Sequence, residues 1–199
     1  MTFRARGDPC LSIFAHIYAT GALVFPLQAR VLEVGCAEAD WVTPMLELRP
    51  DLQVTGIDWR AADRPGTVIR GDVLVHDFPA ESFDVMVGIS SIEHIGLGHY
   101  DEDPLDVDGD QHCMARVARW LKPGGWVYLD VPYGPTYTVH GTEYRAYDEA
   151  TLAARLAPGL QVTGRWYIER PGTDVVAGVP PNPHIVRYAA LHAVKAQES

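Results

Sequence analysis

The sequence has few cysteines and no long hydrophobic run. Its three cysteines are odd in number and form no CxxC pair, so neither a disulfide framework nor a thiolate zinc site is expected. No apolar segment approaches the roughly 20 residues that a membrane helix needs. The first 14 residues also lack the basic and then apolar order of a signal peptide. We therefore expect a soluble, cytoplasmic protein.

Basic residues are also scarce. The 199 residues include 16 Lys and Arg against 26 Asp and Glu, which gives a formal net charge of -10. This charge repels a phosphate backbone, so we expect no nucleic-acid or membrane partner unless basic residues gather locally. The length and the 47% of hydrophobic residues fit one globular domain over 1–199. Within it we expect an N-terminal helical segment, 1–29, that covers the site, and a core over 30–199.

Short apolar runs alternate with helical stretches along the chain. Strands are predicted at 30–34, 53–57, 67–70, 83–89, 126–131, 161–169 and 184–194, and helices at 9–20, 40–48, 109–121 and 149–157. This alternation predicts right-handed crossovers and a parallel sheet with helices on both faces. The last two strands have too short a connection for a helix and should pair antiparallel. The predicted fold is α/β: a doubly wound, mostly parallel, seven-stranded sheet with one antiparallel edge strand.

Small and acidic residues follow the predicted strands, at the end where sheets of this kind bind ligands. A turn of small residues begins at Gly35, after the first strand. Asp58 ends the second strand, where its carboxylate could accept hydrogen bonds from both hydroxyls of a ribose. Asp72 follows the third strand and Ser90 the fourth. Because the first turn has one glycine where GxGxxG is expected, a nicotinamide-binding Rossmann domain is disfavoured.

Five sequence motifs at the ends of the predicted strands resemble, in order and spacing, those of the class I methyltransferases that use S-adenosylmethionine. They are the Glu-Val-Gly-Cys turn, the acid ending the second strand, Gly-Asp-Val, the strand Phe-Asp-Val-Met-Val with Ile-Glu-His-Ile after it, and Leu-Lys-Pro-Gly-Gly. The last motif lies at 121–125, and its residues 122–125 are predicted to form a structural turn. The resemblance covers about residues 31–131, and it implies S-adenosylmethionine as the cofactor.

The resemblance also implies a role for each matching residue. The Gly35 turn would line the methionine part, which Glu33 would orient. Asp58 would hold the ribose, and Asp72 with the Val73 backbone N–H would contact the adenine edge. Each acid has a structural interpretation as well: a bond to a turn N–H for Glu33, a helix cap for Asp58, a turn for Asp72. The predicted cofactor-binding residues are Glu33, Gly35, Cys36, Ala37, Asp58, Asp72, Val73 and Ser90.

A narrower likeness begins at Ser90. The Gly-Leu-Gly segment and the loop Asp-Pro-Leu-Asp-Val-Asp-Gly-Asp at 103–110 resemble a methyltransferase-like family of unknown function, and Arg145 and Tyr147 also fit it. Because that family's activity is unsettled, this likeness adds little about the substrate.

The acids at 101–110 could bind a divalent cation, because oxygen ligands at alternate positions suit a hard metal. The calcium-loop pattern fails, however, since Gln111 stands where the glycine is expected and Val117 where the last acid is expected. Asp108 with Gln111 predicts a helix capping box, and Asp110 is favourable at a helix N-terminus. We therefore predict no metal site.

Three histidines fall near the predicted mouth of the site. His94 follows the fourth strand, His99 lies shortly after it, and His140 lies in the loop after the fifth strand. An imidazole is a suitable base for a hydroxyl or an acidic N–H, although each ring could equally be structural. We expect methyl transfer from S-adenosylmethionine to an oxygen or nitrogen of a small-molecule acceptor, such as a sugar hydroxyl. The alternatives are a non-catalytic binding or regulatory module and a protein methyltransferase.

Overall fold

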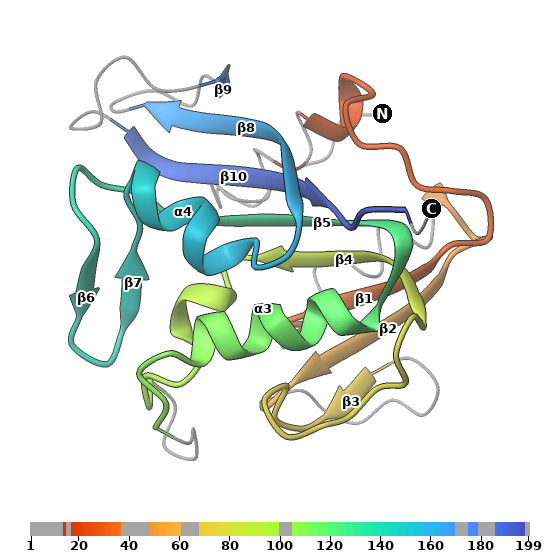
Figure 1. Cartoon of the computed structure of the whole chain (residues 1–199), viewed down its shortest axis with the longest axis horizontal. Coiled ribbons are helices and arrows are strands. Elements are labelled where there is room, and N and C mark those ends of the chain that lie inside the picture. The colour runs from red at the N-terminus through yellow and green to blue at the C-terminus, as the bar shows by residue number, and fades with distance from the viewer. Residues whose placement is uncertain are drawn as a thin grey trace.

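The molecule is organised around one mostly parallel sheet. This computed structural model describes residues 14, 17–36, 48–60, 68–99, 105–169, 175–178 and 186–197. The main sheet has eight strands in the order β3-β2-β1-β4-β5-β10-β8-β9 (Figure 1). They are β1 (Arg30–Val34), β2 (Gln53–Asp58), β3 (Val68–Arg70), β4 (Phe83–Ile89), β5 (Leu121–Pro132), β8 (Gln161–Glu169), β9 (Val175–Ala177) and β10 (Val186–Val194).

Strands β1 to β5 are parallel, as the alternation of strands and helices predicted. β1 lies between β2 and β4, and four of its five residues are buried. From β1 the chain proceeds to β2 and β3 on one side, and β4 and β5 follow on the other side. This reversal of strand order leaves a crevice at the carboxyl ends of β1 and β4, where doubly wound sheets bind ligands.

The position of β10 corrects one part of the prediction. β10 is antiparallel to β5 and to β8, so the antiparallel pairing of the last two predicted strands is confirmed. It lies between them, however, and the short β9, antiparallel to β8, occupies the edge. Successive residues Ala189, Ala190 and Leu191 point to opposite faces and are all buried, which suits an interior strand. The doubly wound α/β class itself is confirmed.

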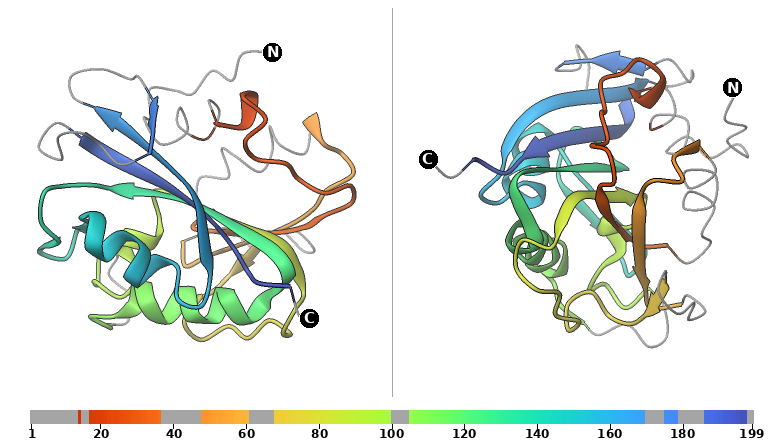
Figure 2. Two further views of the ribbon diagram at one scale, coloured as in Figure 1. Left: turned by 45° about the horizontal axis from the view of Figure 1, so that its top comes forward. Right: turned by 90° about the vertical axis from the view of Figure 1, so that its right-hand side faces the viewer.

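Described segments pack on both faces of the sheet (Figure 2). On one face lie α3 (Gly109–Trp120) and α4 (Glu149–Leu156), whose Trp120 and Leu152 belong to the larger core cluster. The other face is covered by the N-terminal segment, where Phe14 packs edge-on against Tyr128 with ring centroids 5.1 Å apart. In the part of the chain that the structure describes, no helix is both long and apolar enough to cross a membrane.

The N-terminal helix ends where the sequence predicted. Residues 17–19 are helical, and Gly21 follows with φ +74°, a left-handed conformation that glycine adopts without strain. The Gly21 N–H donates to the Tyr18 carbonyl and the Ala22 N–H to the Ile17 carbonyl, which satisfies the last turn. The start of this segment, predicted to cover the site, and most of the predicted helix 40–48 lie outside the described residues.

The segment 122–125, predicted as a structural turn, forms a bulge within β5. Pairing with β4 passes from Phe83–Leu121 directly to Val85–Trp126, and Gly124 has φ +76°. The bulge lies at the amino end of β5, opposite the crevice.

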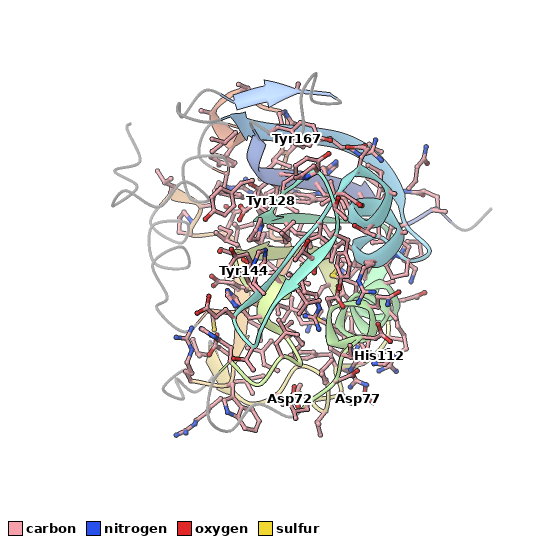
Figure 3. The ribbon with its side chains drawn as sticks, turned by 90° about the vertical axis from the view of Figure 1, so that its left-hand side faces the viewer. Asp72, Asp77, His112, Tyr128, Tyr144 and Tyr167 are labelled. Carbon is pink, nitrogen blue, oxygen red and sulfur yellow. The ribbon has the colours of Figure 1, made fainter. Side chains whose placement is uncertain are left out.

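Two short elements lie at the carboxyl ends of the strands. The 3-10 helix η1 (Ile92–His94) follows β4, and a hairpin of β6 (Thr138–His140) and β7 (Tyr144–Ala146) follows β5. Figure 3 looks onto this end of the molecule, with the hairpin crossing in front of the sheet and carrying Tyr144. These elements bring residues distant in sequence to the mouth of the crevice.

The capping box of α4 gives a first prediction. Asp148 Oδ1 accepts the Thr151 N–H at 2.9 Å, and the Asp148 N–H donates to Thr151 Oγ1 at 3.1 Å. Asp148→Ala should lower the free energy of unfolding by about 1–2 kcal/mol, measured by urea denaturation. Asp148→Asn, which keeps an accepting oxygen, should lose clearly less, and equal losses in the two variants would contradict this assignment.

Candidate functional site

A cleft opens at the carboxyl ends of β1, β2 and β4. Its empty space, including the part open to solvent, is about 640 Å³. Glu33 and Cys36 lie outside its lining, and Ala37 lies outside the described residues. The predicted residues that line it are Gly35, Asp58, Asp72, Val73, Ser90 and the candidate base His94.

Sequence analysis did not select some of the other lining residues, among them three polar or aromatic ones. Trp59, Arg60 and Ser91 line the cleft together with the predicted residues. Each stands one or two positions after an acid or serine that was singled out at a strand end. This position, just after a strand-end acid or serine, is the sequence signal by which these three residues could have been found.

Gly35 brings the first turn close to the loop after β4. Its φ is +85°, and a Cβ at this position would lie 2.2 Å from the Ser91 Cβ, so no larger residue fits. The Ser91 hydroxyl donates to the Val34 carbonyl at 2.8 Å and fixes this approach. Cys36 is 2% exposed and packs against Val68, so its side chain supports the turn instead of lining the cleft.

Asp58 and Asp72 end neighbouring strands, and both also form turns. The Arg60 N–H donates to Asp58 Oδ1 at 2.6 Å, and the Leu74 N–H donates to Asp72 Oδ1 at 2.7 Å. These are Asx turns, so the structural role proposed for Asp72 is present. A carboxylate has acceptor capacity beyond one such bond, and both side chains face a cleft that a ligand can enter.

Glu33 is a buried acid two residues before Gly35. The residue is only 5% exposed, and its side-chain Oε2 has no hydrogen-bond partner among the described residues. Burial, and secondly repulsion by Asp58, raises the pKa of Glu33 to about 8. A cationic group nearby would satisfy Oε2 and favour the ionised form. Glu33, just outside the cleft lining, therefore suits a positively charged ligand group that reaches Oε2.

Ser90 holds the chain reversal after β4. Its φ is +44°, a left-handed value that is uncommon for a residue other than glycine. The Ser90 N–H donates to Asp130 Oδ1 at 3.0 Å, and the Ser90 hydroxyl donates to Glu93 Oε1 at 2.9 Å. Asp130 is fully buried and also accepts the Tyr128 hydroxyl at 2.9 Å. Strain of this kind persists where surrounding contacts hold it, and here it lies in the cleft lining.

The three candidate histidines occupy different places. His94 ends η1 and lines the cleft, with 23% of its side chain exposed. His99 stacks against His94, with ring centroids 5.0 Å apart. His140 lies exposed on β6 and stacks against Tyr144 at 4.5 Å. Of the three, His94 is the one whose side chain lies in the cleft lining, so the geometry favours it as the base.

Arg145 ties the loop after β4 to the loop before α3. Its side chain is fully buried on β7, and its guanidinium donates to four backbone carbonyl oxygens at 2.8–3.4 Å. The carbonyls belong to Glu93, Ile95, Asp106 and Val107. One buried cation therefore fixes the segment that carries His94.

The charge of Arg145 is balanced by a buried acid of α3. Asp110 is fully buried and lies 3.5 Å from Arg145 Nε. Arg155 of α4 donates to both Asp110 oxygens, at 2.6 and 2.8 Å, and the Tyr147 hydroxyl donates to Oδ2 at 2.9 Å. Desolvation, and secondly the charge of Asp110, raises the pKa of Tyr147 well above its ordinary value. Asp110 is thus the anion of a buried network as well as a first-turn acid of α3.

The described part of the acidic loop is engaged by protein groups. Asp106 pairs with His112 at 2.6 Å, and Asp108 accepts from the side chains of Gln111 and Arg155. Asp108 makes no capping bond to the α3 backbone, so the predicted capping box is wrong: its carboxylate is drawn to side-chain donors instead. Within the described residues, no group of three His, Cys, Asp or Glu side chains could hold a metal, and the acids at 101–103 lie outside them.

Removing the Arg145 guanidinium should destabilise the fold strongly. Arg145→Met removes the donor of four backbone carbonyls and leaves the buried Asp110 carboxylate without this cation, so the free energy of unfolding should fall by about 3–5 kcal/mol. Arg145→Lys keeps a cation but has fewer donors, so it should recover only part of the loss. Urea denaturation measures both, and a loss below about 1 kcal/mol in Arg145→Met would refute the role assigned to this residue.

The buried state of Glu33 predicts a pH dependence of stability. Its pKa is raised from the ordinary 4.5 to about 8, so between these values the folded protein keeps a proton that the unfolded chain releases. The free energy of unfolding of the ligand-free protein should therefore fall as pH rises through this range. Glu33→Gln should remove this part of the decline, measured as urea denaturation at the two ends of the range. A decline of equal size in the variant would exclude Glu33 as its source.

A family model and two curated relatives match the chain. The model described as "Caenorhabditis protein of unknown function, DUF268" matches residues 72–167, which include Arg145 and Tyr147. The mouse tRNA N(3)-cytidine methyltransferase METTL2 is 26% identical over 180 residues, or 84% of this chain and 42% of that protein. Human METTL2B is 28% identical over 155 residues, or 73% and 37%. The chain thus spans less than half the length of either relative.

Solved structures with the same fold include a methyltransferase with bound S-adenosylhomocysteine. The 1,6-didemethyltoxoflavin-N1-methyltransferase of Burkholderia thailandensis, with bound 1,6-didemethyltoxoflavin and S-adenosylhomocysteine, aligns with TM-score 0.65 and 18% identity over 98% of this chain and 80% of that chain. The cyclase SpnF aligns with TM-score 0.66 and 16% identity over 100% and 85%. Together these comparisons confirm the predicted resemblance to the class I S-adenosylmethionine-dependent methyltransferases.

Proposed function

We propose that this chain transfers a methyl group from S-adenosylmethionine to an oxygen or nitrogen of a small-molecule acceptor. The observation that carries the proposal is the cleft at the reversal of strand order, lined by the Gly35 turn, Asp58 and Asp72. These are the residues to which the family resemblance assigns the methionine, ribose and adenine parts of the cofactor.

The residues in and beside the cleft fit that cofactor by charge and by shape. The Glu33 Oε2, which has no hydrogen-bond partner among the described residues, suits a cationic ligand group such as the methionine ammonium. Asp58 supplies carboxylate oxygens for ribose hydroxyls, and the Gly35 turn lines the cleft, where a ligand can approach the backbone. When bound, S-adenosylmethionine supplies a methyl group already activated by its sulfonium. The chain then has mainly to hold and align the acceptor.

His94 is the residue we assign to proton removal. It lies in the cleft lining, on η1, at the carboxyl end of β4. An alcohol or amide-like acceptor loses a proton as it is methylated, and an imidazole can accept it near neutral pH. His99 stacks on His94 and would help to orient its ring. A carboxylate acceptor would need no base at all.

We infer the class of acceptor from the net charge of the chain and from the length of its relatives. A net charge of -10 opposes the approach of a polyanion such as tRNA, even though the METTL2 relatives are named as tRNA methyltransferases. Those relatives are more than twice as long as their match to this chain, so their length includes parts that this chain does not cover. We therefore favour a metabolite as acceptor. Protein and tRNA are the alternative acceptors that the assay must also test.

Binding of S-adenosylhomocysteine tests the proposal. Asp58→Ala should weaken it by about 1.5–3 kcal/mol, the scale for losing a charged hydrogen-bond partner, measured by calorimetry of the folded variant. Asp77→Ala is the control, because that carboxylate pairs with Arg119 outside the cleft lining and should leave affinity unchanged. No binding by the wild type at millimolar ligand would instead favour a non-catalytic module, a use of this fold other than methyl transfer.

The acceptor is tested by transfer of labelled methyl from S-adenosylmethionine. A metabolite extract, peptides and tRNA are supplied separately to the whole chain. Incorporation into a small molecule supports the proposal, whereas incorporation into peptide or tRNA alone replaces the small-molecule acceptor with that class.

A further inference from the structure

Both ring nitrogens of His94 face groups that define their roles. Nδ1 contacts the backbone carbonyl oxygen of Glu143, in the turn between β6 and β7. A carbonyl oxygen can only accept a hydrogen bond, so Nδ1 carries the proton. In the neutral ring the lone pair is then on Nε2. The hairpin thereby selects which nitrogen can act as a base.

The second nitrogen faces a buried carboxylate. His94 Nε2 lies 3.7 Å from Glu93 Oε1, and the Glu93 side chain is 1% exposed. This separation is longer than a hydrogen bond, so Glu93 acts on the ring through its charge and not as a hydrogen-bond acceptor. It is short enough for strong attraction between a carboxylate and a protonated ring, because burial reduces screening. The Ser90 hydroxyl donates to the same Glu93 oxygen at 2.9 Å and holds it in place.

We propose that Glu93 is a positioning residue that acts through His94, by stabilising the imidazolium that forms when Nε2 takes a proton from the acceptor. The inference rests on the proposed function for its chemistry. The acceptor oxygen or nitrogen bonds to the methyl carbon as the carbon–sulfur bond breaks, which leaves S-adenosylhomocysteine. The proton lost by the acceptor passes to His94 Nε2, so the positive charge of the sulfonium ends on the imidazolium. Water then removes that proton.

Other charged groups around His94 act against or alongside Glu93. Arg145 donates to the carbonyls of Glu93 and Ile95, so its positive charge opposes protonation of the ring. His99 stacks on His94, and a second protonated ring there would also oppose it. The remaining charged residues that line the same cleft are Asp58, Arg60 and Asp72. Among these acids, Glu93 is the one whose carboxyl oxygen lies 3.7 Å from Nε2.

An NMR titration of the histidine rings tests the proposal in the full chain, without cofactor or acceptor. The signal of His94 is identified by its loss in His94→Asn. Glu93→Gln keeps the shape of the side chain and an oxygen for Ser90, but removes the charge. The pKa of His94 should fall by about one unit or more, the scale for an opposite charge at this range. Glu149→Gln is the control, since that carboxylate binds the Tyr133 and Tyr167 hydroxyls.

Three results test the role proposed for Glu93. A lower His94 pKa in Glu93→Gln with no change in Glu149→Gln supports the proposal. A folded Glu93→Gln protein in which the midpoint does not move overturns it. Nitrogen-15 spectra of the wild type give a second criterion that needs no variant: the neutral ring must carry its proton on Nδ1, and a proton on Nε2 overturns the assignment even where Glu93→Gln fails to fold.

These readouts separate this proposal from the proposed function. Failure of the wild type to bind S-adenosylhomocysteine removes methyl transfer but leaves the measured coupling of Glu93 to His94 unaffected. Where transfer is found, Glu93→Gln should lower kcat by about 10- to 100-fold with unchanged S-adenosylhomocysteine affinity, and the rate should rise with pH at a lower midpoint. A variant with the wild-type pH profile would overturn the role of Glu93 in the reaction.

Discussion

The constraint on which this end of the molecule depends is the burial of one cation. Arg145 has no exposed surface, so its guanidinium must find all its partners within the protein. It finds them in four carbonyls from two loops and in the carboxylate of Asp110. Those loops can approach each other only because Gly96 and Gly109 lack side chains: a Cβ on Gly96 would lie 2.2 Å from the Asp106 carbonyl oxygen.

This buried cation also determines where the candidate base stands. Arg145 belongs to β7, and the turn before β7 presents the Glu143 carbonyl to His94. The same guanidinium binds the carbonyl of Glu93, the residue whose carboxylate faces His94 Nε2. The groups that orient the imidazole are therefore held by a network whose own role is structural. A change in the hairpin can alter the chemistry of His94 without touching any residue in the cleft lining.

The sequence predicted what depends on local pattern. The bounds of β1, β4 and β8 agree with the predicted strands, because their apolar runs end at turn residues. The cleft residues followed from the rule that ligands bind where strands end. The interior place of β10 could not be predicted, because its partners are set by pairing between distant segments. The ion pair of Asp110 with Arg145, 35 residues further on, has no local spacing either, and the same network draws Asp108 away from its predicted cap.

The charges of the cleft bear on turnover under the proposed function. The sulfonium and ammonium of S-adenosylmethionine are both cationic, and the carboxyl groups of Glu33, Asp58 and Asp72 lie in or beside the cleft. The product keeps the ammonium but not the sulfonium charge, so attraction to these acids is stronger before transfer than after it. Arg60, which also lines the cleft, limits the total negative potential and thus the attraction of the product. The acids therefore attract the charged cofactor more strongly than the product, whose sulfur is a neutral thioether. This difference favours release of the product.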